Sequence, residues 1–239
     1  MPDRARTAPL VLSLFPDVRL YLLPGLGADP RMYRNLDCGP DAEVIALPWI
    51  PPGSAADLGA YAEKLIEHYR PEPPYFIGGV SLGGMIAQEW AHLAEVEGLV
   101  LISTAVERAE MAAPIRAAAA LRAGPVISKP LLQALGTAGD RFTSKSPEGR
   151  ALFLEMLRES DADFMTFGAC AVLDWEPPGI AAPYLRIHGT ADRVFPASSV
   201  RDAVMIRGGN HFMIFDRGAE IGKEIGRFLA GSSKNFRRL

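Results

Sequence analysis

The 239-residue chain contains only two cysteines, and they stand far apart in the sequence. Cys38 and Cys170 belong to no Cys-x-x-Cys pair, so the chain lacks the spacing of a disulfide framework or of a thiolate metal site. This cysteine usage favours a reducing compartment. We therefore expect a cytoplasmic protein that carries no bound metal.

Long apolar runs and a large excess of one charge are also missing. The N-terminal run from Leu10 to Phe15 is interrupted by Ser13 and stopped by Pro16, which makes it too short for a signal-peptide core. No other run approaches the length of a membrane span. The 28 acidic and 25 basic side chains give a net charge of -3. Such a balance predicts no nucleic-acid partner and no membrane partner.

Apolar material is plentiful, at 49% of the residues against 22% charged, which is enough for a full core. Short β-rich apolar runs alternate with longer helical segments, which predicts a mostly parallel six-stranded sheet with helices on both faces. The expected strands are Val18–Gly25, Ala42–Trp49, Tyr75–Val80, Val96–Thr104, Tyr184–Thr190 and Asp202–Gly209.

Helix signals fill the gaps between these strands. Ser54 is expected to cap a helix, with Asp57 three residues further on, and the last helix is expected from Arg217 to Leu229. Residues 106–183 show no convincing strand and are typical of three or four short helices. The chain is therefore expected to form a core from residues 1–105 and 184–239, interrupted by a helical lid at 106–183.

The segment Gly79-Val80-Ser81-Leu82-Gly83 matches Gly-x-Ser-x-Gly between an expected strand and an expected helix. This context is the one that a nucleophile elbow requires. The turn is so sharp that the serine adopts a strained backbone and its neighbours two residues away must lack a Cβ. The motif predicts that Ser81 displays its hydroxyl as a nucleophile, whereas a lone motif of this kind is also compatible with an inert turn.

A serine needs a base, and the chain has four histidines. His68 and His92 lie within expected helices, and His188 is interpreted as a structural turn residue at a strand end. His211 follows the last expected strand, where a base would face the elbow. Asp192 follows the strand before it, and the chain order Ser81, Asp192, His211 is the one that accompanies this motif.

An oxyanion trap needs two N–H donors. The N–H of Leu82 opens the helix after the serine, where free donors and the helix dipole favour negative charge. The N–H of Leu26, in the Gly-rich turn after the first strand, is the expected second donor.

These segments together resemble the α/β-hydrolase superfamily, in particular its short, lidded members. The resemblance rests on "LLPGLGADPRMY", "GGVSLGGMIAQ", "HGTADRVFP" and "GGNHFMI", spread from about residue 18 to 230. It implies a Ser–His–Asp triad and no cofactor, and it leaves the substrate open because the fold hosts many chemistries. Two departures are the Pro-Gly start of the first loop, where many members have His-Gly, and the short segment between Asp192 and His211.

The resulting hypothesis is a serine hydrolase that cleaves a small, largely apolar carboxylic ester, thioester or lactone. Lyase or acyltransferase use of the same triad, and a ligand-binding receptor, remain alternatives. The expected partner is a small-molecule acyl substrate, and the expected state is a monomer or homodimer. The residues expected to line the substrate pocket are Met111, Met156, Phe164, Met165 and Phe167. Glu107 is the first alternative to Asp192 as the acid.

Overall fold

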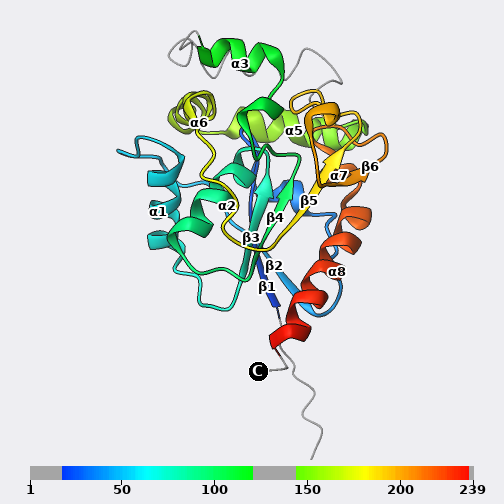
Figure 1. The fold of residues 1–239 in the computed structure, drawn as a ribbon. Coiled ribbons are helices and arrows are strands. Elements are labelled where there is room, and N and C mark those ends of the chain that lie inside the picture. The colour runs from blue at the N-terminus through cyan, green and yellow to red at the C-terminus, as the bar shows by residue number, and fades with distance from the viewer. Residues whose placement is uncertain (1–17, 121–143, 237–239) are drawn as a thin grey trace, which may run out of the picture.

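The computed structural model describes residues 18–120 and 144–236, and within them the core is one six-stranded sheet (Figure 1). The strands are all parallel and lie in the order β2-β1-β3-β4-β5-β6. Their bounds are β1 Val18–Leu23, β2 Ala42–Ala46, β3 Phe76–Val80, β4 Gly98–Ile102, β5 Tyr184–Gly189 and β6 Val204–Ile206. The predicted parallel sheet of six strands is confirmed.

The central strands explain why the sheet is covered on both faces. Every residue of β3 and of β4 is buried, as expected for apolar strands in the middle of a parallel sheet. Successive side chains point to opposite faces. In β1, for example, Leu20 and Leu22 join one apolar cluster and Leu23 joins the other. Two hydrophobic layers therefore enclose the sheet.

Helices supply the outer side of each layer (Figure 1). α1 Leu58–Tyr69 and α2 Leu82–Leu93 pack on one face, and α8 Gly218–Phe236 packs on the other after the short helix α7 Met213–Asp216. α8 contributes Ile221, Ile225 and Leu229 to its cluster. These are three of the four apolar positions that the sequence pattern predicts for one face of the last helix.

Several boundaries differ from the prediction, among them those of α1, β6 and α8. α1 is capped by Asp57, whose Oδ1 accepts from the N–H of Ala60 at 2.8 Å, and the prediction of Ser54 as the cap is wrong. β6 is shorter than expected because Asp202 and Gly208 on either side of it have positive φ, 51° and 73°. α8 continues beyond Leu229, the residue where the apolar pattern ends.

The segment that the sequence assigns to an insertion contains no strand in its described residues, 106–120 and 144–183. It holds the 3-10 helix η2 Arg108–Glu110 and three α-helices, α3 Ala113–Ala120, α5 Pro147–Glu159 and α6 Ala162–Asp174. Figure 1 shows these helices beyond the end of the sheet to which the strands point. Gly124-Pro125 and residues 136–139, where the sequence predicts breaks between helices, lie outside the described residues. The function of the segment as a lid stays a prediction.

Candidate active site

Ser81 occupies the turn between β3 and α2 and has a strained backbone. Its φ of 55° and ψ of −117° lie in a region that residues with a side chain rarely adopt. Two hydrogen bonds hold it there. The N–H of Ser81 donates to the carbonyl of Ile102 at 3.0 Å, and the hydroxyl of Thr104 donates to the carbonyl of Ser81 at 2.7 Å. The side chain of Ser81 stays partly exposed, so its hydroxyl is available to a substrate.

The glycines on either side of Ser81 are required by close backbone contacts. A Cβ on Gly79 would lie 2.6 Å from the carbonyl oxygen of Leu23, which is closer than real Cβ atoms approach. A Cβ on Gly83 would collide with the carbonyl oxygens of Leu23 and Pro24. The elbow therefore packs directly against the end of β1. The steric reason that the sequence motif implies is confirmed at both positions.

The two residues assigned to the oxyanion trap come from neighbouring segments. Leu82 is the first residue of α2, where backbone N–H groups have no intrahelical acceptor. Leu26 lies in a turn closed by the N–H of Ala28, which donates to the carbonyl of Gly25 at 3.1 Å. A Cβ on Gly168 of α6 would lie within 3.1 Å of side-chain carbons of both leucines. α6 thus packs closely against both segments at Gly168.

Asp192 and His211, the expected acid and base, lie next to each other at the same edge of the sheet as Ser81. Asp192 follows β5 and His211 follows β6, and the Nδ1 of His211 donates to the Oδ2 of Asp192 at 2.9 Å. The carboxylate is fully buried, while 15% of the His211 side chain is exposed. Because Nδ1 carries the proton in this bond, the neutral ring presents Nε2 as an acceptor.

The loop that carries Asp192 (residues 190–195, the acid loop) fixes the carboxylate with further bonds. The N–H groups of Val194 and Phe195 donate to Oδ1 at 2.8 and 3.1 Å. Burial works against the charged form of Asp192, but His211, His188 and the Phe195 N–H together outweigh it. The pKa of Asp192 therefore lies below its ordinary value, and the carboxylate is ionised at neutral pH.

The three residues assigned to catalysis therefore lie at the carboxyl ends of parallel strands, which is where open α/β sheets form their sites. β4 separates the strand of Ser81 from the strand of Asp192. Asp192 and His211 are joined directly. No hydrogen bond joins Ser81 to His211 within the part of the chain that the structure describes. Catalytic bonds of this kind are often long before a substrate is bound.

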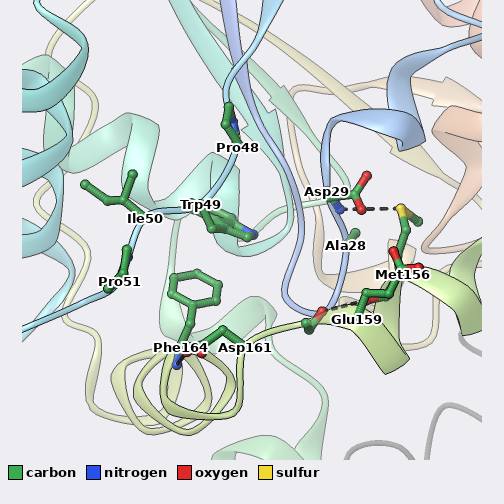
Figure 2. Close-up of a pocket in the computed structure, with 11 residues that line it drawn as sticks. Ala28, Asp29, Pro48, Trp49, Ile50, Pro51, Met156, Glu159, Asp161 and Phe164 are labelled. Carbon is green, nitrogen blue, oxygen red and sulfur yellow. Dashed lines mark hydrogen bonds between the residues drawn. The ribbon is translucent and has the colours of Figure 1, made fainter.

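A cavity of about 260 Å³ lies beside the loop after β1, and Figure 2 shows its walls. Two of the expected pocket residues, Met156 and Phe164, line it. The other three expected pocket residues do not line this cavity. Met165 lies near Gly27, Phe167 packs against Tyr61 with ring centroids 5.2 Å apart, and Met111 is buried in the cluster of α1 and α2.

The walls of this cavity are mainly aromatic and aliphatic. The rings of Trp49 and Phe164 lie with their centroids 4.7 Å apart, and Pro48, Ile50 and Pro51 complete one side. Ala28 links the cavity to the turn that holds Leu26. Neither Ser81 nor His211 lines it, so the cavity adjoins the loop after β1 and does not enclose the hydroxyl.

Other candidates for the chemistry are occupied or suppressed. Burial raises the pKa of the Cys38 thiol to about 12, and burial also raises the pKa of Cys170, so neither is a thiolate at neutral pH. Glu107 is exposed at the start of η2, where its side chain makes no capping hydrogen bond. Glu110 is buried, and both of its carboxylate oxygens accept from Arg186, at 2.8 and 2.5 Å.

The sequence analysis missed two contacts of the acid loop. His188 is a fully buried residue inside β5, and its Nε2 donates to the carbonyl of Phe195 at 2.8 Å. The interpretation of His188 as a turn residue is wrong. The Phe195 ring packs edge-on against the ring of His211, with centroids 5.4 Å apart. A polar residue at the end of an expected strand that also contains Arg186 was the available signal for His188, and nothing in the sequence marked Phe195.

Two absences apply to residues 18–120 and 144–236. These ranges contain no group of three or more His, Cys, Asp or Glu side chains that would hold a metal ion. Their helices include none that combines the length and the apolar character of a membrane span.

The fold and the site together define an α/β protein with a strained serine at a strand–helix elbow and a buried Asp–His pair at the same sheet edge. Residues 10–223 match the model of the alpha/beta hydrolase family. Since this match covers most of the chain, the chain belongs to the α/β-hydrolase family. No curated protein matches the chain.

Solved structures share this fold at low sequence identity. A thermophilic esterase from Thermogutta terrifontis is 17% identical, with 91% of each chain covered and a TM-score of 0.68. A carboxylesterase structure from Nitrososphaera gargenis is 17% identical, with 92% of each chain covered and a TM-score of 0.67. The RedJ thioesterase from Streptomyces coelicolor is 19% identical, with 96% of each chain covered and a TM-score of 0.59. At these identities the likeness shows the fold alone.

Proposed function

We propose that the chain is a serine hydrolase that cleaves small, largely apolar carboxylic esters, or related thioesters and lactones, through an acyl-enzyme. The observation that carries the proposal is the placement of strained Ser81 at the same sheet edge as the buried Asp192–His211 pair. Membership of the α/β-hydrolase family supports a hydrolase, as do the esterases and the thioesterase among the solved structures that share the fold.

In the proposed mechanism the Ser81 hydroxyl attacks the acyl carbon while the Nε2 of His211 takes its proton. The buried Asp192 carboxylate keeps the proton of His211 on Nδ1 and stabilises the imidazolium that forms. The N–H groups of Leu26 and Leu82 would hold the oxyanion, and each such donor stabilises a transition state by about 3 kcal/mol in known sites. His211 then protonates the leaving group, and water repeats the sequence on the acyl-enzyme.

The cavity beside the loop after β1 is the proposed place for the part of the substrate that lies away from the scissile bond. Its aromatic wall of Trp49 and Phe164 suits a flat or branched apolar group. The charged side chains among its lining residues are Asp29, Glu159 and Asp161, all acidic. Arg31 pairs with Asp29 and Glu159, whereas Asp161 caps α6 through the N–H of Phe164. Arg31 offsets two of the three acidic charges, so an anionic group at this end would meet the charge of Asp161, and a neutral group is favoured.

The test is reaction with a fluorophosphonate probe and turnover of short-chain aryl esters. Ser81→Ala is expected to abolish both labelling and turnover. Ser103→Ala is a matched control, because Ser103 ends the neighbouring strand with a φ of 45° yet is fully buried. That variant should keep its labelling. A wild-type protein that neither labels nor turns over, or a Ser81→Ala variant that keeps full activity, would overturn the proposal.

Two further measurements refine the substrate. Product analysis separates hydrolysis from lyase or acyl-transfer use of the same groups. Aryl esters of equal size, with and without a carboxylate on the acyl group, test the charge of the cavity. The neutral ester should have the lower KM, and equal KM values would show that the cavity does not receive the acyl group.

A further inference from the structure

The strand that leads to the acid loop carries a second histidine next to the proposed acid. His188 is fully buried, and its Nε2 lies 3.5 Å from the Oδ2 of Asp192, the same oxygen that accepts from His211. The same nitrogen lies 2.8 Å from the carbonyl of Phe195. A carbonyl oxygen can only accept, so Nε2 carries a proton that it donates to Phe195, and the Asp192 oxygen lies beside this bond at the longer distance.

The other nitrogen of His188 defines the charge state of the ring. Nδ1 is buried and has no hydrogen-bond partner among the described residues. A lone pair there is tolerable, whereas a second N–H would be a buried donor without an acceptor on a charged ring. Burial lowers the pKa of His188 despite the attraction of Asp192, and His211 and Arg186 lower it further. The neutral ring with its proton on Nε2 is the form that the surroundings fit.

Phe195 ties this histidine to both members of the Asp–His pair. Its N–H donates to the Oδ1 of Asp192 at 3.1 Å, its carbonyl accepts from His188, and its ring packs against His211. The acid loop runs from β5 to η4 Ala197–Ser199, and no helix lies within it to hold its backbone in place. His188 thus holds the loop at Phe195, the residue that contacts both Asp192 and His211.

We propose that His188 is a positioning residue whose Nε2–H holds the carbonyl of Phe195, and with it the loop that carries Asp192, so that Oδ2 stays directed at His211. This role rests on the proposed function, because it concerns the acid of the same site. His188 does not touch the substrate or exchange a proton during the reaction. Its contribution requires only that it stay neutral and keep its proton on Nε2.

The kinetic test compares His188→Leu, which removes the donor, with His188→Gln, whose amide supplies an N–H at a similar distance. His188→Leu should lower kcat on a short-chain aryl ester about 10-fold, because the carbonyl of Phe195 loses its buried donor and the loop no longer holds Asp192 in place. KM should stay within about 2-fold, and His188→Gln should recover most of the loss. Ile187→Val is the matched control, because Ile187 is buried on the opposite face of the same strand. It should lower the melting temperature with little change in kcat.

A measurement without turnover keeps the test independent of the proposed function and of variants that fail to fold. Nitrogen NMR of the imidazoles in the wild-type protein should show His188 as the neutral Nε2–H form at pH 7. An Nδ1–H form, a charged ring at this pH, or equal kcat values in His188→Leu and wild type would overturn the inference. If Ser81 proves inert, the kinetics are silent and the NMR result still decides the geometry.

Discussion

The two sides of the site are held by different kinds of force. On the serine side, β1, β3 and α2 meet so closely that Gly79 and Gly83 leave no room for a Cβ against the end of β1. Ser81 is strained because close-packed backbone around it allows no other path. On the acid side, the backbone of the acid loop is shaped by directional polar bonds that converge on Asp192.

The difference teaches how each side should fail. Close packing resists any added volume but is indifferent to charge and to pH. A buried polar network keeps its shape only while every donor and acceptor has the right protonation state. Substitutions that add volume should therefore damage the serine side, whereas changes of charge should damage the acid side and leave the fold in place.

Asp192→Asn is expected to give the largest effect. The N–H groups of Val194 and Phe195 would hold the amide oxygen, so the NH₂ group would face His211 and favour the tautomer without a proton on Nδ1. Activity on a short-chain aryl ester should fall by about 10⁴-fold, as in other Ser–His–Asp sites. The measurement is kcat/KM together with the circular dichroism spectrum, which should be unchanged.

Asp216→Asn is the matched control for this variant. Asp216 also has a pKa below its ordinary value, because hydrogen bonds from Ser144 and Ser146 outweigh the opposing effect of burial. Its bonds join the start of α5 to the end of α7. This control should lower the melting temperature and leave kcat/KM within a few-fold. A comparable loss of activity in both variants would show that the Asp192 effect is structural.

Gly83→Ala should break the serine side by sterics alone. The added methyl group would collide with the carbonyl oxygens of Leu23 and Pro24, so β1 and α2 must separate. The expected loss in the free energy of unfolding is about 3 kcal/mol, at the upper end of overpacking costs. Urea unfolding measures it. Gly222→Ala tests the same clash away from the site, since its Cβ would meet the backbone of Asp37. That variant should be destabilised while its remaining folded fraction labels normally.

The serine side could be predicted from the sequence because its geometry is local. Gly-x-Ser-x-Gly between an apolar run and a helical pattern leaves one backbone path, and the path is observed at Ser81. The order of the strand ends likewise predicted which loops carry Asp192 and His211, and these two residues are in contact.

The contacts of His188 and Phe195 could not be predicted in the same way. His188 reaches the carbonyl of Phe195 and the carboxylate of Asp192 only because the acid loop folds back over β5. Its neighbours are thus set by the path of a loop, which has no periodic signal. The sequence offered only a polar residue before a glycine at the end of an expected strand, a position that is typical of a turn.

The pocket shows a second limit of the sequence. Periodicity identifies an amphipathic helix, but the rotation of a helix about its axis depends on the elements packed against it. Phe164 therefore lines the cavity and Phe167, three residues further on, does not, although both rings pack on Tyr61. Trp49 lines the cavity from a segment where the sequence analysis expected the end of a strand.

The smallest expected effect is a pH dependence of stability that separates the two sides. Burial lowers the pKa of His188 below 6.5. Just below that pH, the unfolded chain therefore binds a proton at His188 that the folded chain does not bind. The contribution is fully present above about pH 6.5 and is lost as the pH falls below it, with a slope of at most about 1.4 kcal/mol per pH unit for one proton. The lowered pKa of Asp192 acts only below about pH 3.8, outside this window. Urea unfolding between about pH 5 and 7.5 should show the slope in wild type and in Gly83→Ala, which lowers the curve without changing its shape. His188→Gln should flatten it, and a slope that persists in that variant would assign it to a group other than His188.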